Sequence, residues 1–130
     1  MTAAYLDSSY LLAIIFGEPR FATLQRKLAG FDQIVSADLL TAECLSASGR
    51  EGLDPASVLA PLRSIALVLP PRSLEAELLE ASTHGRLRGA DLWHVANALF
   101  VAGEARGDLP FLSRDEAQRK VARRLGFPTP

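Results

Sequence analysis

The chain has 130 residues, of which 48% are hydrophobic and 22% are charged. This length and composition predict one domain with a hydrophobic core and exclude an intrinsically disordered chain. No apolar run reaches the roughly 18 residues of a membrane-spanning helix, and the N-terminal segment lacks the basic start of a signal peptide. The single cysteine, Cys44, excludes an internal disulfide, so we expect a cytoplasmic protein.

The net charge is −1, from 14 basic and 15 acidic residues. A nucleic-acid-binding protein usually has a basic excess, so the overall charge does not by itself indicate RNA. Basic residues do gather between positions 114 and 124, namely Arg114, Arg119, Lys120, Arg123 and Arg124. A solvated helix face is the ordinary explanation of such a run, and charge alone favours it.

The first half of the chain predicts short strands that alternate with helices. In chain order we expect a strand over 2–6, helices over 10–16 and 19–28, a strand at 34–35 and a helix over 37–49. Asp7 stands between the first strand and the first helix, where capping residues are found. Gly17 ends that helix, Pro19 can open the next, and Ser36 is expected to cap the third.

The second half continues the alternation. We expect a helix over 55–65, a strand over 66–69, helices over 73–85 and 89–105, a strand over 110–113 and a last helix that contains 121 and 125. Asp54 and Pro55 fit the N-cap and first position of a helix, and Ser113 with Glu116 fits a capping box. This order predicts an α/β fold with a central parallel β-sheet of four to five short strands flanked by helices.

Four acidic residues stand out in this arrangement. Asp7 and Asp115 follow predicted strands, and Asp91 opens a helix in the same part of an α/β repeat. In parallel sheets, ligands bind outside the carboxyl ends of the strands. Glu43 lies within a helix on a face that should point to the core, where an isolated carboxylate is expensive.

Capping is the alternative explanation for three of these acids, because carboxylates are favoured in the first turn of a helix. Capping does not explain Glu43. Carboxylates that converge repel each other unless cations hold them together. Hard oxygen ligands without a Cys or His cluster suit Mg²⁺ or Mn²⁺, and a site of that kind is suited to phosphodiester hydrolysis.

At these residues the sequence resembles the PIN-domain nucleases, and more closely the VapC-type toxins of toxin–antitoxin pairs. The resemblance lies in four segments that occur in the family's order across nearly the whole chain: AAYLDSSYLLAIIFGEP, SADLLTAECLSA, LRGADLWHVANAL and PFLSRDEAQRKVARRLGF. It implies a single PIN-like domain over 1–130. It also implies an endoribonuclease that hydrolyses RNA phosphodiester bonds with metal-activated water.

The resemblance assigns the catalytic and metal-binding roles to Asp7, Glu43, Asp91 and Asp115. It implies Mg²⁺ as the cofactor, with Mn²⁺ as a substitute. It further implies a homodimer that is neutralised by a cognate antitoxin protein.

Several neighbours of these acids are further candidates. Ser8, Ser9 and Ser113 can hydrogen-bond a carboxylate or a metal-bound water, and helix capping is the alternative. His94 comes one turn after Asp91 and can point to the same pocket, although packing is the more usual role of such a residue.

Three arginines are candidates for RNA binding: Arg114, Arg86 and Arg88. For each of them a solvated surface position is the alternative.

Two other functions stay open at this point. A PIN-like nuclease can act in RNA processing or DNA repair instead of as a toxin. A non-catalytic binding module is the other alternative, in which the acids are caps and the apolar helix with Tyr10, Leu11, Ile14 and Phe16 contacts a partner.

Overall fold

The computed structural model describes residues 2–130. Its strands are β1 (Ala3–Leu6), β2 (Gln33–Ala37), β3 (Ala66–Val68) and β4 (Phe111–Leu112). Its helices are α1 (Ser8–Ile15), α2 (Phe21–Ala29), α3 (Leu39–Arg50), α4 (Pro55–Leu62), α5 (Glu75–Ser82), α6 (Gly89–Ala102) and α7 (Glu116–Arg124), with a short 3-10 turn η1 (Arg106–Asp108). In this part of the chain no helix is long and apolar enough to cross a membrane.

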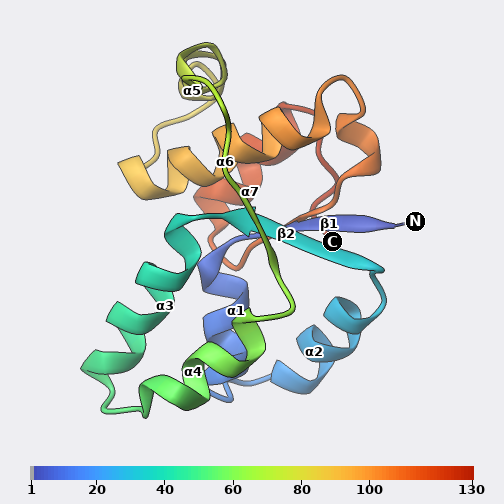
Figure 1. Cartoon of the computed structure of the whole chain (residues 1–130). Helices are drawn as coiled ribbons and strands as arrows, with labels where there is room; N and C mark the ends of the chain where they lie inside the picture. Colours follow the sequence, from blue (N-terminus) through green and yellow to red (C-terminus); the bar gives the residue numbers. More distant parts are fainter. Residues whose placement is uncertain (1) are drawn as a thin grey trace.

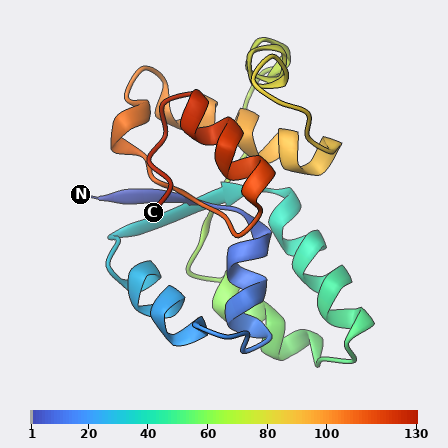
Figure 2. The same cartoon turned by 180° about the vertical axis from the view of Figure 1, so that it is seen from behind.

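The described strands form one parallel sheet in the order β3-β2-β1-β4. Helices α1 to α4 cover one side of this sheet and α5 to α7 cover the other (Figures 1 and 2). The predicted fold class is therefore confirmed, with four strands. Parallel strands need a crossover between them, and here each crossover carries at least one helix.

Strand β1 lies between β2 and β4 and separates two hydrophobic clusters. Ala4 and Leu6 pack into the cluster under α1 to α4, whereas Tyr5 packs into the cluster under α6 and α7. This alternation follows from the two-residue period of a strand, and all three residues are fully buried. Tyr5 also stacks on Phe111 of β4, with the ring centroids 5.3 Å apart.

The pairing of β1 with β4 aligns the carboxyl ends of these two strands. Leu6 pairs with Leu112, and the amide of Asp7 donates to the Leu112 carbonyl at 2.9 Å. The residues that follow, Asp7 and Ser113, therefore leave the sheet side by side. This edge is the place where the sequence predicts a ligand site.

The structure corrects two predicted helix caps. Ser36 lies inside β2, and its hydroxyl donates to the Leu6 carbonyl at 2.6 Å, so it ties two strands together instead of capping α3. The cap of α7 is Asp115, whose carboxylate accepts from the amide of Gln118, so the predicted Ser113–Glu116 capping box is wrong. The Asp54–Pro55 cap of α4 is confirmed.

Candidate functional site

Asp7 is the most deeply buried acid at this edge, with 2% of its surface exposed. One carboxylate oxygen accepts from the amide of Ser9 at 3.0 Å and from its hydroxyl at 2.5 Å, which makes Asp7 the N-cap of α1. The other oxygen accepts from the side-chain amide of Gln118 at 3.2 Å. Both oxygens are thus held by donors, which a buried carboxylate requires.

His94 of α6 joins Asp7 to Glu43. Its Nε2 lies 2.5 Å from Oε1 of Glu43 and 3.7 Å from Oδ1 of Asp7, and its Nδ1 lies 2.8 Å from the hydroxyl of Tyr5. The ring is fully buried, whereas the Glu43 side chain is 21% exposed. Glu43 therefore reaches from α3 to the margin of the core, where its partner is a histidine.

Burial of the ring on its own would lower the pKa of His94. The hydrogen bond to Glu43 and the charges of Asp7, Glu43 and Asp91 outweigh burial, so that the pKa of His94 lies above its ordinary value. A cationic ring donates from both nitrogens, which suits one carboxylate and one hydroxyl. The protonated form of His94 supplies a positive charge next to Glu43 and Asp7.

Gln118 connects the remaining elements of the site. It is fully buried, its side-chain amide nitrogen donates to Asp7 and also to the Asp91 carbonyl at 3.1 Å, and its carbonyl oxygen accepts from Ser113 at 2.7 Å. Its backbone amide donates to Asp115 at 2.9 Å. One side chain of α7 thus fixes the ends of β1 and β4 and the start of α6.

Asp91 lies in the first turn of α6, and its side chain is 19% exposed. Burial raises its pKa, and so do the negative charges of Asp7 and Asp115, against a smaller opposing effect of Arg88. The only described cation that pairs with its carboxylate is Arg88, at 3.6 Å. The carboxylate of Asp91 is therefore close enough to the others to be repelled by them.

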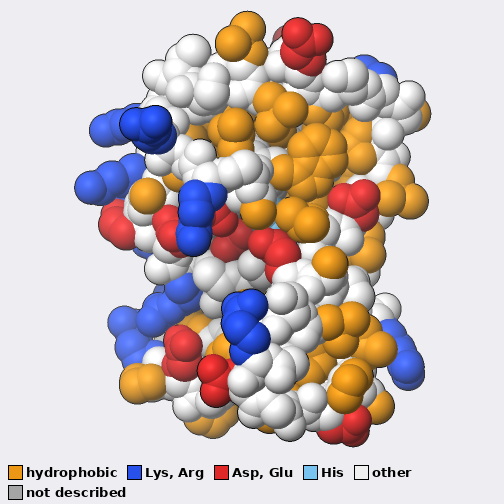
Figure 3. Space-filling model, turned by 90° about the vertical axis from the view of Figure 1, so that its left-hand side faces the viewer, with side chains coloured by type: hydrophobic (Ala, Val, Ile, Leu, Met, Phe, Trp, Pro, Cys, Tyr) orange, Lys and Arg blue, Asp and Glu red, His pale blue; other side chains and the backbone are white. Residues whose placement is uncertain are grey.

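The predicted acids lie at one end of the molecule, but within residues 2–130 no three acidic, histidine or cysteine side chains are already arranged as a metal cage. Figure 3 looks onto this end of the molecule, where acidic side chains gather across the middle with basic side chains beside them. In this arrangement His94 lies between Glu43 and Asp7, and Gln118 links Asp7 to the backbone of Asp91.

The three serines take different positions. Ser9 supports Asp7 and lies 3.3 Å from the hydroxyl of Ser113, which also accepts from the amide of Asp115 at 3.0 Å. Ser8 lines a shallow hollow of about 410 Å³ together with Glu43. Ser9 therefore holds the Asp7 carboxylate directly, whereas Ser113 contacts Ser9, Gln118 and the backbone of Asp115.

The three arginine candidates for RNA binding also lie in different places. Arg88 is largely exposed beside Asp91, and Arg86 is exposed on the turn before α6. Arg114 lines a polar pocket next to Ser113.

Sequence reasoning did not single out Gln118 or Tyr5 and favoured a packing role for His94. The signal for Gln118 was present in the sequence, because it lies three and seven residues before Val121 and Leu125, on the buried face of α7. A glutamine on an apolar helical face needs buried partners, and these partners are the residues of the site.

The fold and the site define a parallel α/β domain with carboxylates at the carboxyl end of its sheet. The sequence pattern of the PIN domain matches residues 4–124, and the chain belongs to the PIN domain family. PIN domains are generally nucleases and usually bind divalent metal ions. No curated protein and no solved structure gave a match to the chain.

Proposed function

We propose that this PIN domain is a metal-dependent endoribonuclease and the toxin of a type II toxin–antitoxin pair. The observation that carries the nuclease proposal is the buried Asp7 carboxylate, flanked by other acids at the carboxyl end of the sheet. Placing a buried carboxylate beside partly buried ones costs free energy, so a purely structural role explains this arrangement poorly.

The donor set fits Mg²⁺ or Mn²⁺. Hard carboxylate oxygens are the ligands of these ions. Burial raises the pKa of Asp91, and the nearby negative charges of Asp7 and Asp115 raise it further. We propose Asp7, Glu43, Asp91 and Asp115 as the residues that hold the ion. When bound, the ion supplies positive charge against the phosphate and activates water for hydrolysis.

The other residues of the site position these carboxylates. Ser9 and Gln118 fix both oxygens of Asp7, and His94 orients Glu43 from behind with support from Tyr5. Carboxylates that are oriented before the ion arrives lose less freedom when they bind it. These roles assign His94 to positioning and not to proton transfer from water.

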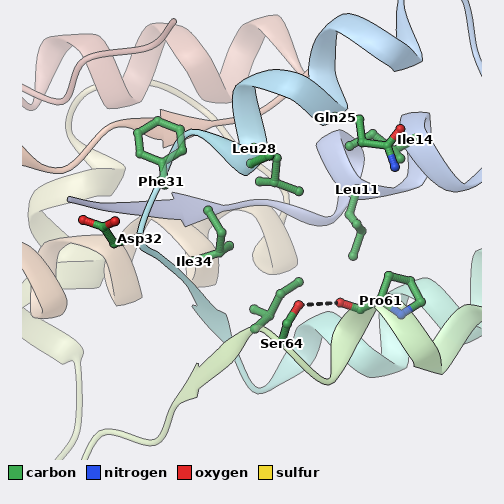
Figure 4. Close-up of a pocket in the computed structure, with 11 residues that line it drawn as sticks. Leu11, Ile14, Gln25, Leu28, Phe31, Asp32, Ile34, Pro61 and Ser64 are labelled. Atoms are coloured by element: carbon green, nitrogen blue, oxygen red, sulfur yellow. Dashed lines mark hydrogen bonds between the residues drawn. The ribbon is translucent and has the colours of Figure 1, made fainter. Parts of the chain in front are cut away.

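An apolar hollow on the α1–α2 side of the domain supports the toxin part of the proposal. It has a volume of about 360 Å³, and its lining includes Leu11, Ile14, Leu28, Phe31 and Ile34 (Figure 4). Leu11 and Ile14 belong to the first helix, whose apolar surface exceeds what one core-facing side needs. We propose that this hollow receives an apolar segment of the antitoxin and that the nuclease itself is a homodimer.

The decisive experiment incubates the purified protein with mixed structured RNA and Mg²⁺ or Mn²⁺. EDTA and Asp7→Asn serve as parallel controls, and circular dichroism checks that the variant is folded. Cleavage that is lost in both controls supports the nuclease. Equal cleavage by folded Asp7→Asn contradicts the site assignment.

Expression in a bacterial host separates the toxin from a nuclease of RNA processing or DNA repair. The toxin proposal predicts that induction of the wild-type chain arrests growth, whereas Asp7→Asn does not. Normal growth with active wild-type nuclease present contradicts the toxin role and favours a housekeeping one.

A further inference from the structure

A basic pocket lies beside the acidic site, on the far side of Ser113. It has a volume of about 420 Å³ and extends between one side of α2, from Arg20 to Lys27, and the start of α7. Four cationic side chains line it: Arg20, Lys27, Arg114 and Arg119. The acidic side chain in its lining is Glu116, which pairs with Arg123 at 2.8 Å and with Arg119 at 3.4 Å.

Three of these cations are not engaged by the protein. Among residues 2–130, the side chains of Arg20, Lys27 and Arg114 make no ion pair or hydrogen bond. Arg119 differs, because its guanidinium donates to the carbonyls of Ser113 and Thr129 and so builds the wall of the pocket. Like charges around one hollow raise its positive potential, and an anion that enters it gains from all of them.

The backbone at Arg20 adds an independent sign of function. It has a φ of +73°, the left-handed conformation, and no other described residue apart from glycines has a positive φ. A long side chain rarely adopts this conformation, and strained residues of this kind cluster at binding and active sites. The strain here holds Arg20 at the start of α2, on the rim of the basic pocket.

The basic pocket shares a wall with the acidic site. The backbone amide of Arg114 donates to the hydroxyl of Ser9 at 3.0 Å, and the same hydroxyl holds Asp7. Ser113 lines the pocket, and its hydroxyl contacts Ser9. An anion in the pocket therefore lies only about one side-chain layer from the carboxylates.

We infer that the basic pocket binds one phosphodiester of a single-stranded RNA while the adjacent phosphodiester of the same strand lies at the acidic site. This inference rests on the proposed nuclease function and adds Arg20 and Lys27 to the RNA contacts. Guanidinium groups match phosphate oxygens in geometry as well as charge. A polyanion with regularly spaced phosphates can occupy both places at once, and the pocket then fixes which bond reaches the acids.

The test measures binding without cleavage. A short fluorescein-labelled single-stranded RNA of mixed sequence is titrated with the full chain in EDTA at low salt, and fluorescence anisotropy is followed at several salt concentrations. The variants are Lys27→Gln and Arg114→Gln, with Arg63→Gln, an exposed arginine at the end of α4, as the matched control.

Each pocket variant is expected to weaken RNA binding and to reduce the slope of log K against log salt by about 0.7, the value for one lost phosphate contact on a single strand. Arg63→Gln is expected to change neither quantity. Circular dichroism establishes that each variant is folded.

The outcomes separate this inference from the proposed function. Pocket variants that bind with wild-type affinity and slope, or wild type that binds no RNA, overturn the inference even if the enzyme cleaves RNA. If the pocket variants lose RNA binding while wild type shows no metal-dependent cleavage, the result supports the basic pocket and overturns the nuclease proposal. A polyglutamate peptide serves as a competitor. If it displaces the RNA, and if its own binding depends on Lys27 and Arg114 more strongly than RNA binding does, the pocket binds an acidic protein segment and the inference is overturned.

Discussion

Replacement of Gln118 by leucine tests how much the polar network of the site contributes to the fold. Leucine has a similar size but removes the bonds to Asp7, Ser113 and the Asp91 carbonyl. A buried group that loses its partner costs about 1–3 kcal/mol. Ser113 and Asp7 keep other partners, so we expect a total loss of about 2–4 kcal/mol, or a fall in Tm of about 6–15 °C.

Urea unfolding followed by circular dichroism measures this loss for Gln118→Leu against wild type. Gln33→Leu is the matched control, because Gln33 is exposed at the start of β2, and we expect it to change stability by less than about 0.5 kcal/mol. A Gln118→Leu protein as stable as wild type in EDTA would refute the reasoning, because it would mean that the hydrogen bonds of Gln118 contribute nothing net.

Three further predictions concern charge. Excess Mg²⁺ or Mn²⁺ raises the Tm of wild type in a thermal scan, because an ion that binds the folded state stabilises it. Asp7→Asn removes most of this rise, because the variant lacks one of the proposed ligands. Asp91→Asn raises the Tm in EDTA at neutral pH, because burial and the charges of Asp7 and Asp115 disfavour the ionised Asp91. This gain shrinks as pH falls and Asp91 becomes protonated. The hydrogen bond from Arg106 lowers the pKa of Glu80. Their ion pair therefore stabilises the fold fully at pH values above the ordinary carboxyl pKa, and this stabilisation is lost as pH falls through the lowered pKa of Glu80. With Glu80 41% exposed, Glu80→Gln should cost below about 1 kcal/mol in urea unfolding at neutral pH and nothing in acid.

The order of strands and helices could be predicted from the sequence because several of the short apolar runs are bounded by a strong local signal. Asp54–Pro55 is such a signal, and α4 begins there. One of the two wrong caps arose where a polar side chain finds its partner in a distant element. Ser36 bonds to Leu6 across two strands, a contact that depends on the register of β1 and β2 and not on neighbouring residues.

The candidate site likewise contains residues whose positions could be predicted from the sequence and contacts that could not. The positions of Asp7 and Asp115 could be predicted, since each follows a strand and caps a helix. The contact between His94 and Glu43 could not, because it joins residues 51 positions apart through the packing of α6 against the sheet edge. Local patterns identify which residues carry charge, but only the tertiary fold shows which of them balance each other.

Hydrogen bonds within the site explain how several acidic side chains can lie close together in the folded chain. Glu43 is balanced by a buried histidine, Asp7 by an amide and a serine, and Asp115 by the backbone of the helix that it caps. Asp91 has only an exposed arginine, and its pKa is raised. Asp91 is therefore the carboxylate that the described hydrogen bonds and ion pairs satisfy least, whereas the other three are fixed by theirs. If the proposed ion binds, the network around Gln118 and His94 has already oriented these three carboxylates, so that they lose less freedom on binding.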